Sequence, residues 1–126
     1  MKKRELLVMV VETERPLAYL FQLDLAQHGH RVNVVHSAEH ALKVLTPKYD
    51  LVVTSLDLPD MSGEQFLLKM RARVGYADIP VLVIAPDAEL PPSIRDDATQ
   101  LRRKPFDLAH FVRYATDAAG PSRFPN

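Results

Sequence analysis

Short apolar runs rich in β-branched residues alternate along the chain with longer segments whose apolar residues recur at helical spacing. Five of these runs are predicted as strands, over residues 5–11, 31–35, 49–55, 79–85 and 99–104. The first, third and fourth are apolar throughout, as strands covered on both faces should be. The second and fifth carry polar side chains, which favours the edges of a sheet: Arg31, Asn33, Arg102 and Arg103. The alternation predicts repeated βα units, and therefore an α/β fold with a parallel sheet between helices.

Four segments are predicted as helices from their start signals and their apolar stripes. Ser37, Ser62 and Asp107 are predicted N-caps of the last three, and Ser62 with Gln65 fits a capping box. Gly29 is expected to stop the first helix. The side chains expected to face the core are Leu17, Leu20, Phe21 and Leu25, then Ala38, Ala41, Leu42 and Leu45, then Phe66, Leu67 and Met70, and finally Leu108, Phe111, Val112 and Ala115.

The length of 126 residues fits one domain, predicted over residues 1–119, with a flexible C-terminal tail or linker stub over 120–126. Lys and Arg together number 16, as do Asp and Glu, so the formal net charge is zero. Neither nucleic acid nor an anionic membrane is therefore an expected partner of this domain alone. The chain has no Cys and no run long enough to span a bilayer, which favours a cytoplasmic protein.

Open α/β sheets bind their ligands beyond the carboxyl ends of the strands, so the residues that follow the predicted strands are the candidates for function. They are Glu12, Thr13 and Glu14 after the first strand, Ser55 and Asp57 after the third, Ala85 after the fourth and Lys104 after the fifth.

Five motifs, in order, resemble those of the receiver domain of bacterial response regulators. They are VVETE (10–14), GHRVNVVHSAEHAL (29–42), DLVVTSLDLPDMSG (50–63), IPVLVIA (79–85) and RKPFD (103–107). The resemblance implies a flavodoxin-like, three-layer α/β/α sandwich whose five parallel strands have the order 2-1-3-4-5. Pro91 and Pro92 break a helix interior, so the family's fourth helix is expected to be short or altered.

The resemblance also implies phosphoryl transfer from a histidine kinase to an Asp at the end of the third strand, and Ser55 stands in that position. A carboxylate can attack phosphorus without activation, whereas a Ser hydroxyl is weakly nucleophilic until a base takes its proton. A phosphoserine would also lack the rapid hydrolysis that makes the family's acyl phosphate a timed switch. We therefore expect Ser55 to be a degenerate phosphoacceptor position.

The acidic pocket beside Ser55 departs from the family too. In the family, two acidic residues after the first strand hold Mg²⁺, but Glu12 and Thr13 occupy their places here. Asp57 matches a position that supplies mainly its backbone carbonyl. The loss of two of the family's three carboxylates is expected to weaken a Mg²⁺ site badly, so neither a metal nor another cofactor is predicted.

Three further positions belong to the family's conformational switch. Ala85 stands where a Thr or Ser usually follows the phosphoryl group, and Leu101 stands where the family has a switching aromatic residue. Lys104 is retained, and we expect its ammonium group to pair with Glu12 or Asp57, because a partly buried cation needs a partner.

The leading hypothesis is a non-phosphorylatable receiver domain that is not an enzyme and acts as a protein-protein interaction module in bacterial two-component signalling. Its partner would be another signalling protein or a second copy of the chain. The family uses its fourth helix, fifth strand and fifth helix as the contact surface, which corresponds to residues 87–118. Candidate contacts are Arg102, Arg103, His110, Arg113 and Tyr114.

Two alternatives remain open. The first is a residual phosphotransfer domain that accepts a phosphoryl group at Asp57 or Ser55 with help from Mg²⁺, and the retention of Glu12 and Lys104 motivates it. The second is a small flavodoxin-like enzyme or nucleotide-binding protein. The loop ETERP (12–16) disfavours the second, because it has no Gly that would let a phosphate approach the backbone.

Overall fold

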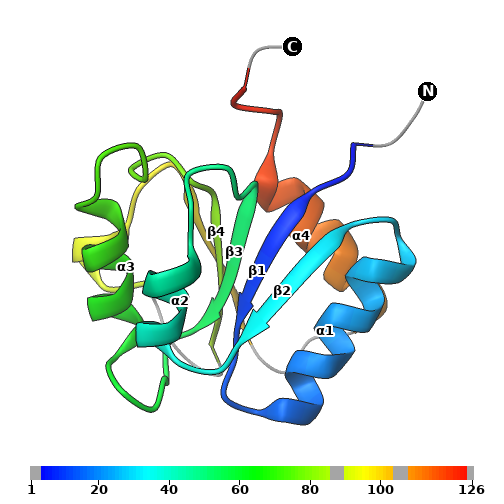
Figure 1. Ribbon diagram of the computed structural model, residues 1–126, viewed down its shortest axis with the longest axis horizontal. Coiled ribbons are helices and arrows are strands. Elements are labelled where there is room, and N and C mark those ends of the chain that lie inside the picture. The colour runs from blue at the N-terminus through cyan, green and yellow to red at the C-terminus, as the bar shows by residue number, and fades with distance from the viewer. Residues whose placement is uncertain (1–3, 86–89, 104–107, 125–126) are drawn as a thin grey trace.

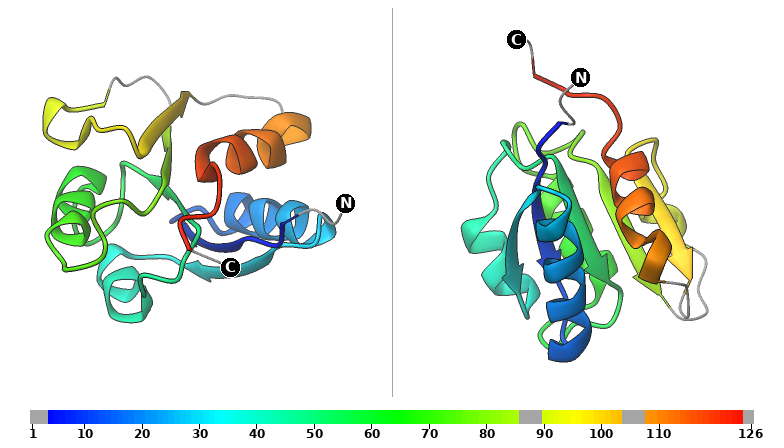
Figure 2. Two further views of the ribbon diagram at one scale, coloured as in Figure 1. Left: turned by 90° about the horizontal axis from the view of Figure 1, so that it is seen from above. Right: turned by 90° about the vertical axis from the view of Figure 1, so that its right-hand side faces the viewer.

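The computed structural model describes residues 4–85, 90–103 and 108–124. Its five strands are β1 (Leu7–Val11), β2 (Arg31–Val35), β3 (Leu51–Ser55), β4 (Val81–Ala85) and β5 (Thr99–Arg103). They form one parallel sheet in the order β2-β1-β3-β4-β5, so the predicted strand order is confirmed. The helices are α1 (Arg15–Gln27), α2 (Ala38–Val44), α3 (Gly63–Arg71) and α4 (Phe111–Ala119). Helices α1 and α4 cover one face of the sheet, and α2 and α3 cover the other (Figures 1 and 2).

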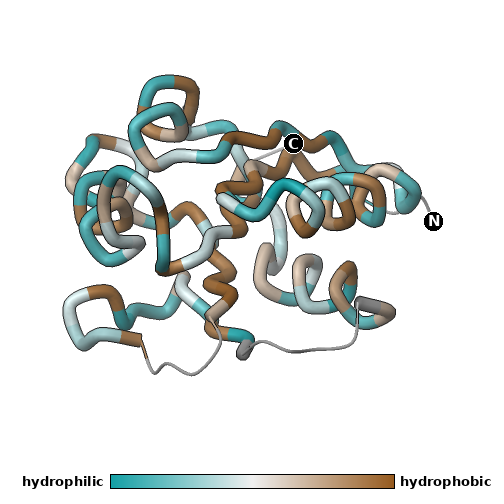
Figure 3. The backbone as a smooth tube through the Cα atoms, turned by 90° about the horizontal axis from the view of Figure 1, so that it is seen from below, coloured by the Kyte–Doolittle hydropathy of each residue, from teal (hydrophilic) through white to brown (hydrophobic). Residues whose placement is uncertain are grey.

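The core is divided by the sheet into two apolar layers, because successive side chains of a strand point to opposite faces. Met9 and Val11 of β1 pack toward α2 and α3, whereas Val8 and Val10 pack toward α1 and α4. Strands β3 and β4 are buried along their whole length, and Figure 3 shows the central strands largely in brown, the hydrophobic end of its scale. The edge strand β2 is mostly exposed or half-buried, as its polar residues predict.

The predicted caps of two helices are confirmed. Ser37 accepts a hydrogen bond from the backbone N–H of His40 at the start of α2. At the start of α3, Ser62 and Gln65 form both hydrogen bonds of a capping box. Each bond satisfies a backbone N–H that has no partner within its own helix.

The predicted stripe of α1 is wrong at one position. Phe21 and Leu25 are buried, but Leu20 is 42% exposed, and Ala18 lies in the core instead. Ala18, Phe21 and Leu25 are spaced as i, i+3 and i+7, which puts them on one face of the helix. Leu20 is turned away from that face.

The last part of the domain begins with a 3₁₀ turn (Leu108–His110), and α4 starts only at Phe111, with His110 as its N-cap. The predicted cap, Asp107, lies outside the described residues. Between β4 and β5, the described residues contain a single 3₁₀ turn (Pro92–Ile94), which agrees with the expected short or altered helix. None of the helices in the described ranges is long and apolar enough to cross a membrane.

The stretch predicted as a tail lies against the domain as far as it is described. Arg123 donates hydrogen bonds to the backbone oxygens of Pro47 and Tyr49, at 3.2 and 2.7 Å, and its Nη1 is 3.0 Å from Asp78 Oδ1. Figure 1 shows this segment, in red, at the amino-terminal end of the sheet. Arg123 therefore joins this segment to the domain, whereas the flexible tail and the domain boundary at residue 119 stay predictions.

Candidate functional site

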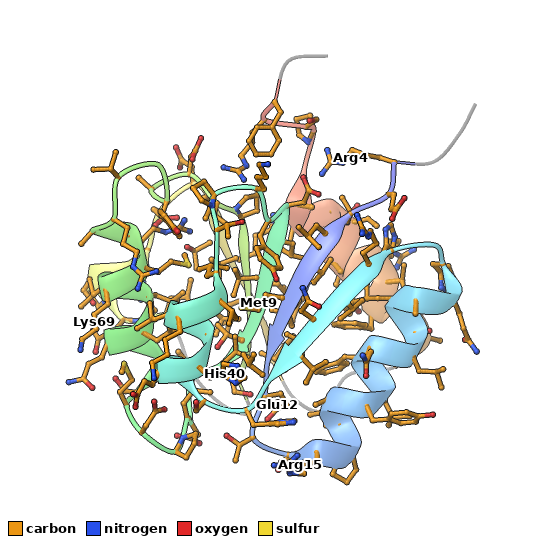
Figure 4. All side chains as sticks on the ribbon, in the orientation of Figure 1. Arg4, Met9, Glu12, Arg15, His40 and Lys69 are labelled. Atoms are coloured by element: carbon orange, nitrogen blue, oxygen red, sulfur yellow. The ribbon has the colours of Figure 1, made fainter. Side chains whose placement is uncertain are left out.

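The candidate site lies where β1, β3 and β4 end, at the same edge of the parallel sheet. Glu12 follows β1 and Ser55 ends β3, and the register pairs Ser55 with Ile84 of β4. Figure 4 labels Glu12 at this edge, at the opposite end of β1 from Arg4. A cleft of about 340 Å³ opens here, and its lining residues are Glu12, Thr13, Glu14, Ser55, Leu56, Asp57 and Ile84.

Ser55 and Glu12 form the central contact of the cleft. The Ser55 hydroxyl donates a hydrogen bond of 2.6 Å to Glu12 Oε1, and the two residues are only 5% and 3% exposed. Hydrogen bonds from a hydroxyl to a carboxylate are typically this short, because the charge strengthens them. The other carboxylate oxygen, Oε2, accepts the backbone N–H of Glu14 at 3.1 Å. Both oxygens of Glu12 are therefore engaged by the protein itself.

Neighbouring backbone contacts fix the position of Glu12. Its N–H donates to the carbonyl of Val35 at the end of β2. Its carbonyl lies 2.8 Å from Nδ1 of His36, which must be the donor because a carbonyl can only accept. The end of β2 thus fixes the backbone of Glu12, and the carboxylate reaches Ser55 at the end of β3. Sequence reasoning assigned His36 no role, because only the fold brings it to Glu12.

The other predicted pocket residues are arranged less tightly. The Thr13 hydroxyl donates to the backbone oxygen of Asp57 at the long distance of 3.4 Å. The side chain of Asp57 is exposed, and its backbone forms an isolated antiparallel bridge with Ser62. Thr13 therefore contacts the main chain of Asp57, and no hydrogen bond joins either side chain to Ser55 among the described contacts.

Gly63 allows the loop after β3 to fold back against the acceptor position. Its N–H donates to the carbonyl of Leu56 at 2.7 Å. A Cβ atom at this position would lie 2.7 Å from both the Cα of Leu56 and the backbone oxygen of Ser55. The sequence shows a Gly in a loop motif but not that the backbone passes so close to it.

Asp60 joins this loop to the start of α2. Its two carboxylate oxygens accept the backbone N–H groups of Ala38 and Glu39 at 3.0 and 2.7 Å. Burial raises the pKa of Asp60, but hydrogen bonds from the backbone N–H groups of Glu39, Ala38, Asp60 itself and Met61 lower it more, so the pKa lies below its ordinary value of 3.8. The sequence next to α2 indicates only its local N-cap, Ser37. It could not reveal the contact with Asp60, because that carboxylate comes from a loop distant in the sequence.

We expect Asp60→Asn to lower the free energy of unfolding by about 1 kcal/mol at neutral pH, the usual size of a lost helix cap. The folded-state pKa is lowered, so the wild type has this stabilisation above the pKa of the unfolded Asp and loses it as the pH falls through the folded pKa. Urea unfolding at neutral pH and at about pH 3 measures this loss. The free energies of unfolding of the wild type and of Asp60→Asn should differ less at the acidic pH. A stability gap of the same size at both pH values would contradict this role.

Removal of the buried hydroxyl by Ser55→Ala is expected to lower the free energy of unfolding by about 1.5 kcal/mol, because Glu12 loses its short hydrogen bond inside the protein. Ser93→Ala is the matched control. The Ser93 hydroxyl also donates to a carboxylate, that of Glu64, but on the exposed surface, so its loss should change stability by less than about 0.5 kcal/mol. Urea unfolding measures both variants. If both lowered the free energy of unfolding equally, burial would not make the Ser55 hydrogen bond more stabilising than the exposed one.

A comparison with protein families identifies this arrangement. The family model of the response regulator receiver domain matches residues 8–115. The chain belongs to this family. It is 33% identical over 104 residues to the response regulator protein FleR of Pseudomonas aeruginosa, covering 79% of this chain and 22% of that protein. It is 26% identical over 109 residues to the response regulator ArlR of Staphylococcus aureus, covering 83% of this chain and 48% of ArlR. The chain thus spans less than half of each of these relatives.

Solved receiver structures share the fold. The non-phosphorylated HemR receiver domain of Leptospira biflexa superposes with a TM-score of 0.83 at 24% identity, covering 97% of this chain and all of that one. The chemotaxis response regulator CheY4 of Vibrio cholerae gives 0.76 at 20% identity, covering 88% of this chain and 96% of CheY4. These likenesses support the receiver fold and carry no residue roles.

The donor set of this receiver domain does not fit the Mg²⁺ ion that the resemblance to the family implies. Mg²⁺ needs near-octahedral oxygen ligation, usually with carboxylates. Here Glu12 accepts two hydrogen bonds from the protein, Thr13 is neutral, and the Asp57 side chain is exposed. No group of three or more His, Cys, Asp or Glu residues is placed to hold a metal ion in the described part of the chain.

The switch positions of the receiver fall partly within the described residues. Ala85 ends β4, is buried and pairs with Arg103. Leu101 is half-buried in β5 and packs against the core layer beneath α2 and α3. Lys104 lies outside the described residues, so its expected pairing with Glu12 or Asp57 stays a prediction.

The predicted contact residues of the receiver come together across β5 and the start of α4. The Arg102 guanidinium lies over the ring of Tyr114, 4.4 Å from its centroid. The His110 ring is 6.2 Å from the Tyr114 ring, and Nη2 of Arg113 is 3.5 Å from Nδ1 of His110. Arg103 is placed only by its backbone pairing in β5.

Proposed function

We propose that this receiver domain does not carry a phosphoryl switch at residue 55 and acts as a protein-protein interaction module in two-component signalling. The observation that supports this most directly is the 2.6 Å hydrogen bond from Ser55 to Glu12. The acceptor position holds a neutral hydroxyl whose proton points to a buried carboxylate. A binding function needs no reaction at this position, so the domain is proposed not to be an enzyme.

The surroundings of Ser55 support the same proposal. A phosphoryl group there would add about two negative charges beside the carboxylate of Glu12, and like charges in a buried site repel strongly. Ala85 has no hydroxyl with which to follow such a group, and Leu101 has no aromatic ring. The zero net charge and the lack of Cys favour a protein partner in the cytoplasm over nucleic acid or membrane.

We propose that the partner contacts the face formed by β5 and α4. Arg102 is stacked on Tyr114, which holds a cation and an aromatic ring together as protein interfaces often do. His110 and Arg113 are exposed beside them, so this face presents basic side chains. A signalling protein with acidic residues, or an acidic face of a second copy, is complementary to it.

The same hydrogen bond supports a second candidate, residual phosphotransfer to Ser55. In that reaction the Ser55 oxygen would bond to the phosphorus of an acyl phosphate, the bond from phosphorus to the acyl oxygen would break, and Glu12 would accept the hydroxyl proton. The buried Ser55 and the exposed carboxylate of Asp57 are then competing acceptors.

A Ser55→Asp variant separates the two candidates. Its new carboxylate would lie beside Glu12, so the two charges should destabilise the variant, and Mg²⁺ should offset the repulsion. We expect Mg²⁺ to raise the thermal midpoint of this variant by about 4 °C and to leave the wild type unchanged. Ser93→Asp, which adds a carboxylate beside Glu64 at an exposed position, is the control and should respond like the wild type. Equal stabilisation of the wild type would favour the phosphotransfer candidate.

A further inference from the structure

A second and larger groove lies at the other end of the sheet from the Ser55 cleft. Its volume is about 510 Å³, against about 340 Å³ for the cleft. It lies between the end of α1, the segment leading into β1, and one side of α4. Helices α1 and α4 lie side by side there, and stacking of Phe21 on Phe111, with centroids 4.2 Å apart, joins them (Figure 2).

The polar lining of this groove is basic. Arg4, His28, His30 and Arg113 all contribute to it, and its lining contains no Asp or Glu within the described residues. This concentration of basic side chains is local, because the whole chain has a net charge of zero. Its two Arg side chains carry positive charge, and a concave surface whose charges have one sign focuses the field and favours an anion.

Hydrogen bonds hold several of these basic groups in place. Nη1 of Arg4 donates to the carbonyl of Gly120 at 2.8 Å, and Nη2 is 4.0 Å from Asp50, which is outside the lining. The backbone N–H of Leu6 donates to Nδ1 of His30 at 3.0 Å, so that ring carries its proton on Nε2. Groups fixed before binding lose less conformational entropy when a ligand arrives.

The remaining lining is apolar. Leu6 is only 3% exposed, Val112 adds aliphatic surface from α4, and Ala109 adds it from the 3₁₀ turn before that helix. A groove with an apolar wall and a few convergent polar groups is typical of small-molecule sites. An inorganic anion would use only the basic groups and leave the apolar wall in water.

We propose that this groove binds a small organic anion, namely a phosphate or carboxylate group carried on an apolar body. Arg113 and His28 face the charged group from α4 and α1, and Leu6 and Val112 contact the body. Because the groove is at the opposite end of β1 from Glu12, such a ligand would act on the receiver without entering the Ser55 cleft (Figure 4). The proposal is independent of whether Ser55 accepts a phosphoryl group.

The test is titration of the full chain, followed by the backbone amide signals in two-dimensional NMR, with phenyl phosphate and benzoate as probes. Inorganic phosphate supplies the head group alone and phenol the body alone. We expect saturable shifts of the amide signals around Leu6, His30 and Val112. Inorganic phosphate and phenol should each bind about tenfold or more weakly than phenyl phosphate. The tighter of the two whole probes identifies the preferred head group.

Two matched variants make the test specific. Arg113 is exposed, so Arg113→Gln should fold normally and weaken phenyl phosphate binding by about tenfold, the size of one lost charge-assisted hydrogen bond. Arg15 is also an exposed cation, at the other end of α1, and Arg15→Gln should change the affinity by less than about twofold. The proposal is overturned if the groove amides do not shift, if phenol binds as well as phenyl phosphate, or if the two variants weaken binding equally.

Discussion

Replacement of Arg71 by Ala is expected to lower the free energy of unfolding by about 3 kcal/mol, within the range for removing one partner of a buried charged network. Arg71 ends α3, and its side chain is only 15% exposed. Its Nη1 donates to the backbone oxygens of Tyr76 and Ile79 at 3.2 and 2.5 Å, and its Nη2 donates to Thr99 Oγ1 at 3.1 Å. One guanidinium therefore joins α3, the loop before β4, and β5.

Two carboxylates only partly offset the cost of burying the Arg71 charge. Burial lowers the pKa of its guanidinium, Asp96 and Asp78 raise it, and Arg123 lowers it, so the pKa lies below its ordinary value. Nε lies 3.4 Å from Asp96 Oδ2. Arg71→Lys keeps a charge but not the planar fork of donors, so its stability should fall between those of the wild type and Arg71→Ala. Arg113→Ala, at an exposed position, should change stability by less than about 0.5 kcal/mol. Urea unfolding measures these variants. If Arg71→Ala lowered the free energy of unfolding no more than Arg113→Ala, the contacts of Arg71 would not stabilise the domain as described.

Gly63→Ala is expected to destabilise the domain by about 2 kcal/mol, although helix propensity alone favours Ala over Gly by about 1 kcal/mol. Gly63 is the first residue of α3, and a Cβ there would lie 2.7 Å from two backbone atoms, of Leu56 and Ser55. Because neither contact is the end of a flexible side chain, the loop itself must move. The main chain that positions Ser55 would move with it.

The sign of this change is the informative result. Lys69→Ala, on the exposed surface of the same helix, is the control and should stay within about 0.5 kcal/mol of the wild type. Thermal or urea unfolding measures both variants, and NMR shifts of the Ser55 and Leu56 amides report the loop. A stabilised Gly63→Ala variant would mean that the loop after β3 does not approach Gly63 as closely as described.

The strands could be predicted from the sequence because each depends on a local pattern, whereas their order was implied only by the resemblance to receiver domains. Runs such as LVVTS (51–55) are apolar on both faces, and the polar residues of β2 and β5 indicate edges. The caps Ser37 and Ser62 lie next to the helices that they start, so they too could be found. Leu20 was assigned to the wrong face because α1 has apolar residues on more than one side.

The location of the candidate site could be predicted from the sequence, but the contacts between its side chains could not. Residues that follow parallel strands gather at one edge, which is why Glu12 and Ser55 were both candidates. Their 2.6 Å contact depends on the rotamers of two side chains 43 positions apart, and no sequence spacing encodes it. The same holds for Asp60 at the start of α2 and for Arg71 at β5, because each bond joins elements that only the fold brings together.

The central claim is that Ser55 has replaced the family's phosphoryl switch, and the most direct test is the intact mass of the chain after incubation with acetyl phosphate and Mg²⁺. A Ser55→Asp variant treated identically shows whether the rest of the site still supports transfer. Our account predicts no phosphoryl gain on the wild type, whether or not the variant is labelled. A gain of one phosphoryl group on the wild type, mapped to Ser55 or Asp57, would contradict it.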